Sequence, residues 1–316
     1  YLRSRCQFVY VNGDKSETTY IKKGVPQGSV LGPILFLIYI NDLPQAAPTG
    51  KITLFADDTT ITNTSDDIAK LSNNDNVSNE YFTRWSLSNK LVINKDKSQN
   101  FICSLRTLDC KKKSIKLLGI VLDTTLCWNF HVDYILDRIA KNLFVLRQMH
   151  GVVALETLLT VYHSCVGSLI SYGILLWGHS PHAARIFSFQ RKCIRVIAGL
   201  GYRQECRHVF KDLRILTVPS VYILHCLMYI HSHISEFNTA DHMYMTRSCD
   251  LFRPNFTRIN KSRGSDYFAV KFYNALPPVI KSLRKEVFKK RIKLFLARKA
   301  FFSLDEFCVV SQLKEI

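Results

Sequence analysis

The stretch LFADDTTI, residues 54–61, places two adjacent carboxylates, Asp57 and Asp58, between short runs of apolar and β-branched residues. Residues 52–55 and 59–62 are each long enough for a short strand, and Ile, Thr and Phe favour extended structure. The pattern predicts a β-hairpin that carries both aspartates at its turn.

Two carboxylates held by a rigid turn suit Mg²⁺, because this ion takes few carboxylates and completes its coordination with water and substrate phosphates. Two such ions about 4 Å apart can stabilise the attacking and the leaving oxygen of phosphoryl transfer. The alternative is a solvated turn, since Asp is a common turn residue. From the two aspartates alone, both interpretations stay open.

The residues on the amino-terminal side of this hairpin are punctuated by Gly and Pro. The stretch GVPQGSVLGP, residues 24–33, predicts a structured loop. The apolar run 34–40 predicts a buried helix that closes before Pro44. Residues 6–22 alternate in polarity around Asn12-Gly13, which predicts another β-hairpin.

On the carboxyl-terminal side, Ser65 followed by two acids predicts a helix that runs towards Trp85. Further strands are expected at residues 91–93, 99–103 and 115–122. The first part of the chain is therefore of mixed class, either α/β or α+β.

Apolar residues then recur at helical spacing. Long helices are expected over residues 132–146, 155–177 and 187–197. The second should break at Gly167 or Gly173. Together they predict a helical unit after the mixed part.

The last clear helix is expected over residues 282–300. Its apolar stripe consists of Phe288, Ile292, Phe295 and Leu296, and its other positions are rich in Lys and Arg with one acid, Glu286. Three of its lysines are our candidates for contacts with nucleic-acid phosphates, namely Lys289, Lys290 and Lys293. The alternative is a solvated, solubilising face, because charge runs are often only that.

The charge of the chain points to a polyanionic partner. Lys and Arg number 43 against 25 Asp and Glu, a net charge of +18. Nucleic acid is the first candidate and an anionic membrane surface the second. No signal peptide or transmembrane helix is expected. The cysteines are scattered, which favours reduced thiols in a cytosolic or nuclear protein that is not secreted.

Two groups of residues could be taken for further sites. The cluster of His225, Cys226, His231 and His233 does not have a zinc spacing, and we expect it to pack within a helix. Trp128 and Trp177 have apolar neighbours and are expected in the core, not as base-stacking groups.

Several motifs, in order and spacing, resemble the reverse transcriptases of non-LTR retrotransposons, and most closely the Jockey-like elements of arthropods. The most specific are GVPQGSVLGP (24–33), IYINDLP (38–44) and FADD (55–58). Supporting motifs are LVIN (91–94) with Lys97, LGIVLD (118–123) with Trp128, Tyr172-Gly173 with Trp177-Gly178, FYNALP (272–277) and FSLDEF (302–307).

This resemblance implies an α+β fold. Residues 1–127 would form part of a polymerase palm, residues 128–200 a helical, thumb-like region, and residues 201–316 a basic, mostly helical C-terminal region. The implied reaction is addition of deoxynucleotides to a DNA primer on an RNA template, with Mg²⁺ as cofactor. The implied partners are the template, the primer and deoxynucleotide triphosphates.

The resemblance also assigns roles to residues. Asp57 and Asp58 would hold the metal, with Asp57 the principal ligand. Phe55 would lie under the primer end. Lys97 would assist pyrophosphate departure, and its alternative is a solvated loop residue. The nucleotide and template base would be bordered by the loop residues Pro26, Gln27 and Gly28.

The chain departs from the family pattern at one point. Such enzymes carry a third metal-binding aspartate in an earlier block, and this sequence starts after it, without the fingers and the upstream endonuclease. We therefore expect the chain as given to be inactive as a polymerase. The alternative function is a non-catalytic nucleic-acid-binding module or remnant.

Overall fold

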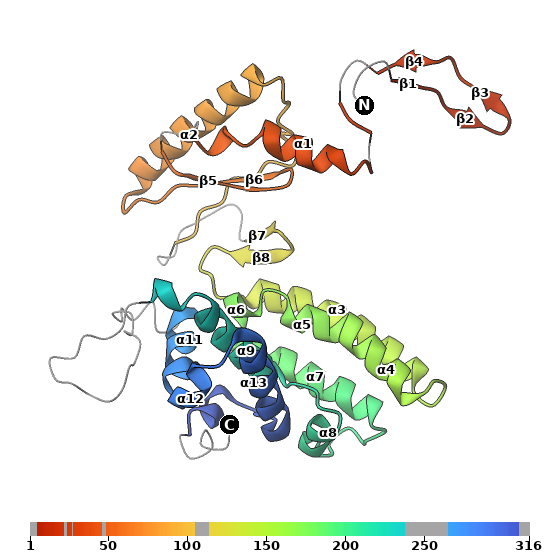
Figure 1. Ribbon diagram of the computed structural model, residues 1–316, viewed down its shortest axis with the longest axis vertical. Helices are drawn as coiled ribbons and strands as arrows, with labels where there is room; N and C mark the ends of the chain where they lie inside the picture. Colours follow the sequence, from red (N-terminus) through yellow and green to blue (C-terminus); the bar gives the residue numbers. More distant parts are fainter. Residues whose placement is uncertain are drawn as a thin grey trace. The chain divides into compact units, whose positions relative to one another are not determined.

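The computed structural model describes residues 5–21, 24–26, 28–45, 49–104, 114–237 and 265–309. The chain divides into two compact units, Tyr1–Gln99 and Asn100–Ile316 (Figure 1). Helix predominates, and the strands form small two-stranded antiparallel sheets, so the fold is α+β.

The first unit begins with a β-hairpin, as expected for residues 6–22. Strand β1 (Cys6–Gln7) pairs with β4 (Thr19–Tyr20), and β2 (Tyr10–Val11) pairs with β3 (Asp14–Lys15). The turn residues Asn12 and Gly13 have positive φ angles of 51° and 96°. Two successive positive φ values give the turn a twist that matches its strands, which is why Asn-Gly is favoured here.

Helix α1 (Leu31–Tyr39) begins inside the predicted loop, where the Ser29 hydroxyl accepts a hydrogen bond from the Gly32 N–H at 3.1 Å. A short 3₁₀ turn, η1 (Leu43–Gln45), follows. The helix is predicted correctly, but its expected burial is wrong, since Ile38 is 69% exposed. An apolar run places apolar side chains on every side of the helix. The other elements of this small unit bury only some of them.

The hairpin with the two aspartates consists of β5 (Lys51–Phe55) and β6 (Asp58–Thr62). Helix α2 (Ile68–Ser88) follows it. Its N-cap is Asp67, whose carboxylate accepts from the Ala69 N–H at 3.1 Å, so the helix begins later than Ser65 suggested.

Two predicted strands are wrong. Residues 91–93 and 99–103 have no ladder partner in the part of the chain that the structure describes. Their composition favours extended backbone, but a strand also needs a neighbouring strand to take its hydrogen bonds.

The second unit begins with a hairpin, β7 (Ser114–Leu117) and β8 (Ile120–Asp123), where one strand over 115–122 was expected. The turn is Leu118-Gly119, with φ angles of 46° and 84°. A single glycine in an apolar run thus reverses the chain.

The predicted helices of the second unit are confirmed. They are α3 (Asn129–Met149), α4 (Leu155–Tyr162), the π-helical turn η2 (His163–Gly167), α5 (Ser168–Ser171), α6 (Ile174–Trp177) and α7 (Ala183–Ile197). The break lies at Gly173, which has a φ of 60°. A Cβ atom there would meet Ile120 Cδ1 at 2.6 Å, so the left-handed backbone and the close approach of the β7–β8 hairpin both favour glycine.

The remaining elements are α8 (Arg207–Asp212), α9 (Val218–Ser232), η3 (Ile234–Glu236), α11 (Ser265–Asn274), α12 (Pro278–Lys281), α13 (Lys285–Lys299) and α14 (Leu304–Phe307). Helix α9 packs against α11 and α13. One continuous hydrophobic core joins these helices to α3–α7, and it contains Trp128 and Trp177 as predicted.

Residues of the histidine cluster pack within this region. The ring of His231, on α9, stacks on Phe288 of α13 with centroids 4.1 Å apart, and Cys226 is fully buried. No group of three or more potential metal ligands occurs among the described residues. None of the helices in the described ranges is long and apolar enough to cross a bilayer.

Candidate functional site

The β5–β6 hairpin holds Asp57 and Asp58 at its tip, as predicted. Phe55 pairs with Asp58, so the turn itself is Ala56-Asp57 and Asp58 already belongs to strand β6. Ala56 has a φ of 51°, a left-handed conformation that is uncommon for a residue with a side chain. Both carboxylates are exposed, which limits the repulsion between them.

Phe55 and Asp58 are directly opposed across the ladder, so their side chains lie on the same face of the hairpin. The ring of Phe55 is 64% exposed. An apolar ring beside a carboxylate is thus presented at the tip, where it can contact an apolar or aromatic surface of a ligand.

The donor set at the tip is suitable for Mg²⁺. Carboxylate oxygens are hard ligands, and two of them leave positions for water and phosphate oxygens. Within the described ranges, no third acidic, His or Cys side chain joins Asp57 and Asp58. A site for two ions would therefore need a further carboxylate.

Of the predicted loop residues, Pro26 and Gly28 are described and exposed, and Gln27 lies outside the described residues. Gly28 has a φ of 79°, and none of the described residues has an atom within 4 Å of where its Cβ would be. The Ser29 N–H donates to the Pro26 carbonyl at 3.2 Å and closes a turn around this position. The described residues therefore leave space beside the Gly28 backbone.

Lys97 lies in a turn organised by Asn94. The Asn94 side-chain oxygen accepts from the N–H groups of Asp96 at 3.1 Å and Lys97 at 3.2 Å. The Lys97 side chain is exposed, and no hydrogen bond or ion pair among the described residues joins it to Asp57 or Asp58.

Helix α13 buries its predicted apolar stripe and exposes Lys289, Lys290 and Lys293. The lysines of this helix lower the pKa of neighbouring histidines. Burial lowers the pKa of His225, and the nearby Lys289 lowers it further. Burial and Lys293 lower the pKa of His163 in the same way.

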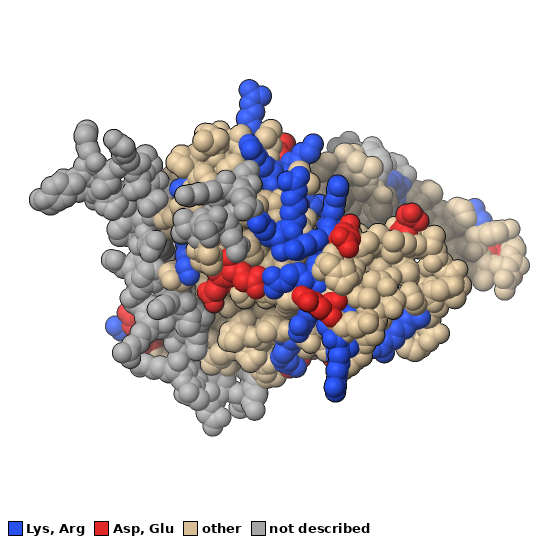
Figure 2. Space-filling view, turned by 90° about the horizontal axis from the view of Figure 1, so that it is seen from below, with Lys and Arg blue, Asp and Glu red and all other residues tan. Residues whose placement is uncertain are grey.

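The space-filling view shows Lys and Arg side chains gathered in a band across one face, with a smaller number of Asp and Glu beside them (Figure 2). Such a concentration of one sign of charge attracts polyanions over a distance of roughly one Debye length.

Sequence reasoning missed one structural residue, Asp123. It is buried, and its Oδ1 accepts from the N–H groups of Thr125 and Cys127 and from the Thr125 hydroxyl. Its Oδ2 accepts from the Trp128 N–H at 2.7 Å. This carboxylate connects the β7–β8 hairpin to the start of α3. The sequence did contain a signal for this role, because an acidic residue follows directly on the apolar residues 120–122.

Comparison with known proteins agrees with these features. Residues 1–122 match the family model of reverse transcriptase (RNA-dependent DNA polymerase). The chain is 27% identical over 239 residues to the RNA-directed DNA polymerase from mobile element jockey of Drosophila melanogaster, covering 68% of this chain and 26% of that protein.

Two further relatives come from the same species. The probable RNA-directed DNA polymerase from transposon X-element is 29% identical over 239 residues, which cover 69% of this chain and 26% of that protein. The corresponding protein from transposon BS is 28% identical over 257 residues, which cover 72% of this chain and 28% of that protein.

The chain spans about a quarter of the length of these relatives. No solved structure matches it significantly. Residues 1–122 carry a reverse transcriptase domain that resembles those of non-LTR retrotransposons.

Proposed function

We propose that this reverse transcriptase domain belongs to an enzyme that adds deoxynucleotides to a DNA primer on an RNA template. The observation that carries the proposal is the exposed pair Asp57 and Asp58 at the tip of the β5–β6 hairpin, inside the matched residues. Nucleotidyl transfer places its developing charge on phosphate oxygens, and a site that concentrates carboxylates can recruit the cation that neutralises it.

Asp57 and Asp58 would hold Mg²⁺, with Asp57 the principal ligand. When bound, this ion supplies electrostatic stabilisation for the triphosphate and its leaving group. Phe55 shares a face with Asp58 and would support the primer end. Lys97 would offset the charge of the departing pyrophosphate.

The loop residues Pro26, Gln27 and Gly28 would border the incoming nucleotide and the template base. The open space at the Gly28 Cβ position supports this role, because it permits close approach of a ligand to the backbone.

The proposed organisation assigns residues 1–127 to part of a palm, 128–200 to a thumb-like region and 201–316 to a basic C-terminal region. Lys289, Lys290 and Lys293 would contact phosphates of the template or primer. DNA synthesis would take place in the nucleus or cytoplasm, where template RNA and deoxynucleotide triphosphates are present.

A second candidate is nucleic-acid binding without catalysis. The exposed basic face of α13 and the net charge of +18 favour it, because neither depends on the two aspartates. Both candidates predict binding, and only the first predicts templated synthesis.

The test is primer extension on an RNA template by a longer polypeptide from the same open reading frame that includes this chain. Asp57→Asn and Asp58→Asn should each lower extension by several orders of magnitude, because members of a catalytic set act together. Asp14→Asn, at the first residue of β3 after the turn of the other hairpin of the first unit, is the matched control and should have no effect. Extension that survives Asp57→Asn would exclude the proposed metal site.

A further inference from the structure

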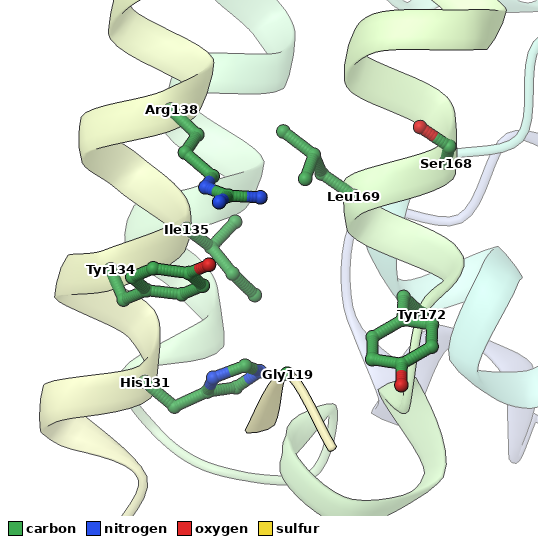
Figure 3. A pocket seen from close by; sticks show the side chains of 8 residues that line it. All are labelled: Gly119, His131, Tyr134, Ile135, Arg138, Ser168, Leu169 and Tyr172. Carbon is green, nitrogen blue, oxygen red and sulfur yellow. The ribbon is translucent and has the colours of Figure 1, made fainter. Parts of the chain in front are cut away.

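The second unit contains a cavity of about 270 Å³ between helix α3 and the segment that includes α5 (Figure 3). A liquid water takes about 30 Å³, so the cavity holds several waters or part of a small organic molecule. It is smaller than the pockets of about 300–1,000 Å³ that enclose drug-sized ligands. A ligand of drug size would therefore lie only partly inside it.

One wall of the cavity is polar and comes from a single face of α3. His131, Tyr134 and Arg138 follow helical spacing, so their side chains form a row. The Arg138 guanidinium lies 4.6 Å from the centroid of the Tyr134 ring, and the His131 ring lies 6.2 Å from it on a nearly parallel plane. The hydroxyl of Tyr134 and the guanidinium of Arg138 point towards the opposite wall (Figure 3).

His131 presents a hydrogen-bond donor that has no acceptor. Its Nδ1 accepts from the Val121 N–H at 3.2 Å, so the ring proton of the neutral form is on Nε2. Burial lowers the pKa of His131 to about 4, so the ring is neutral at pH 7. The side chain is 2% exposed, and Nε2 has no hydrogen-bond partner in the described structure.

The opposite wall is apolar and flat. It contains Leu169 and the ring of Tyr172, with Ser168 at its edge and Ile135 of α3 between the two walls. The Tyr172 hydroxyl donates to the Leu118 carbonyl of the β7–β8 turn, which fixes the ring. A Cβ at Gly119 would lie 3.3 Å from this ring, so the turn packs closely on it. The aromatic surface is thus held in place before any ligand arrives.

Two cations stand at the polar wall. Arg138 lines the cavity, and Lys116 of β7 lies outside the lining, where it is 4.9 Å from the centroid of the Tyr134 ring and donates to the Tyr134 hydroxyl at 3.1 Å. Neither cation forms an ion pair with a carboxylate among the residues that the structure describes. This part of the cavity therefore attracts an anionic group.

We propose that this cavity binds one nucleotide, with its base against Leu169 and Tyr172 and its phosphate at Arg138 and Lys116. A phosphate ion alone would leave the ring of Tyr172 unused, and an apolar molecule would leave both cations unused. A nucleotide joins a flat ring rich in acceptors to an anionic group, which matches both walls.

This site goes beyond the proposed polymerase function. It lies in the second unit, and the aspartate hairpin lies in the first. Its ligand could be a free nucleotide or the end of a nucleic-acid strand, and both present the same chemistry.

The test is isothermal titration of the full chain with adenosine 5′-monophosphate, adenosine and inorganic phosphate. The monophosphate should bind saturably and at least tenfold more tightly than either of the other two. Arg138→Gln should lower the affinity for the monophosphate at least fivefold and leave the affinity for adenosine unchanged. Tyr134→Phe should weaken binding of the monophosphate, because it removes the hydroxyl that accepts from Lys116. Arg147→Gln, an exposed arginine of the same helix outside the cavity, is the matched control.

Equal effects of Arg138→Gln and Arg147→Gln, or monophosphate binding no tighter than that of phosphate, would overturn the proposal. Replacing Lys289, Lys290 and Lys293 with Gln should leave monophosphate binding unchanged, which separates this site from general polyanion binding. A 5′-phosphorylated dinucleotide distinguishes the sources: tighter binding than the monophosphate identifies a strand end, and equal binding a free nucleotide. Arg138 is exposed, so its variant should fold even if Tyr134→Phe does not.

Discussion

Phe55 and Asp58 form the last pair of the β5–β6 ladder, so an exposed aromatic ring and a carboxylate share one face at the tip of the hairpin. Between them lies the two-residue turn, which consists of Ala56, with a left-handed backbone, and Asp57. A left-handed residue other than glycine costs about 1–2 kcal/mol and persists where its surroundings hold it. The strained residue thus lies between Phe55 and Asp57, and all three side chains are exposed.

The first prediction concerns cation binding at this tip. The full chain should bind Mn²⁺, a spectroscopic substitute for Mg²⁺, with weak affinity because only two carboxylates contribute. Asp57→Asn should weaken binding, and replacing both Asp57 and Asp58 should abolish it, as measured by the electron paramagnetic resonance signal of free Mn²⁺. Asp14→Asn, next to the turn of the other hairpin, is the control. Equal binding by the double variant would place the ion elsewhere.

A second prediction concerns Asp123. Replacing its carboxylate with the amide of Asn removes the charge and at least one of the acceptors for the N–H groups of Cys127 and Trp128. Hydrogen bonds to charged groups contribute about 1.5–3 kcal/mol each, and a buried N–H left without an acceptor is costly. Asp123→Asn should therefore lower the free energy of unfolding by roughly 2–3 kcal/mol in urea titrations.

Asp133→Asn is the matched control. Asp133 forms an ion pair with Arg185 at 2.7 Å, but both side chains are about half exposed. Exposed pairs contribute about 0–1 kcal/mol, so this change should be small. If both variants lose the same free energy, Asp123 does not organise the start of α3.

Local signals in the sequence predicted the elements whose formation depends on neighbours along the chain. Asn12-Gly13 has the backbone that its hairpin requires, and the apolar stripe of α13 is buried as its spacing indicated. The aspartate hairpin was predicted for the same reason, because β-branched runs flank a two-residue turn.

Predictions failed where the outcome depends on residues distant in the sequence. The extended run 91–93 has no strand beside it in the described ranges, and α1 is exposed because its apolar surface exceeds what the first unit covers. The cavity beside His131 was missed because its second wall, with Tyr172, comes from a different helix region. Spacing on α3 alone does not reveal what lies opposite.

The third prediction follows from the pKa of His131, which burial lowers to about 4 from an ordinary value of 6.5. Between these values the unfolded chain binds more protons at this site than the folded one. Its contribution to the free energy of unfolding is therefore complete above pH 6.5 and is lost as the pH falls towards 4, by up to roughly 3 kcal/mol.

His131→Asn should remove this part of the pH dependence. The measurement is the free energy of unfolding at several pH values between 4 and 7, compared with the unaltered chain. His150→Asn, at an exposed position after α3, is the control and should retain the full slope. Parallel curves for the unaltered chain and His131→Asn would contradict the prediction.

The fourth prediction concerns the basic face of α13. Each phosphate contact adds roughly 0.9 to the slope of log affinity against log salt on duplex DNA. Replacing Lys289, Lys290 and Lys293 with Gln should lower that slope by about 2–3 if all three make contacts. Fluorescence anisotropy at several salt concentrations measures it.

Glu286→Gln is a control of opposite sign, because it removes the one acidic side chain of the same helix. It should leave the slope unchanged or raise affinity slightly. An unchanged slope in the triple lysine variant would exclude α13 from the nucleic-acid surface and leave its charge as a solvated face.

The last prediction is that the chain as given does not extend a primer. Two-metal transfer needs both ions held, one near the attacking oxygen and one on the leaving side. Asp57 and Asp58 come from the tip of one hairpin, and no third acidic side chain joins them within the described ranges. The chain should still bind RNA and DNA, since its charge of +18 does not depend on this site.

The measurement is primer extension with Mg²⁺ or Mn²⁺ by the chain alone, beside a longer polypeptide from the same reading frame. Only the longer form should extend the primer, because a further carboxylate would complete the ligand set and additional contacts would position the template. Templated extension by the short form that Asp57→Asn abolishes would mean that the third carboxylate lies within this chain. Failure of both forms, with nucleic-acid binding intact, would favour the non-catalytic function.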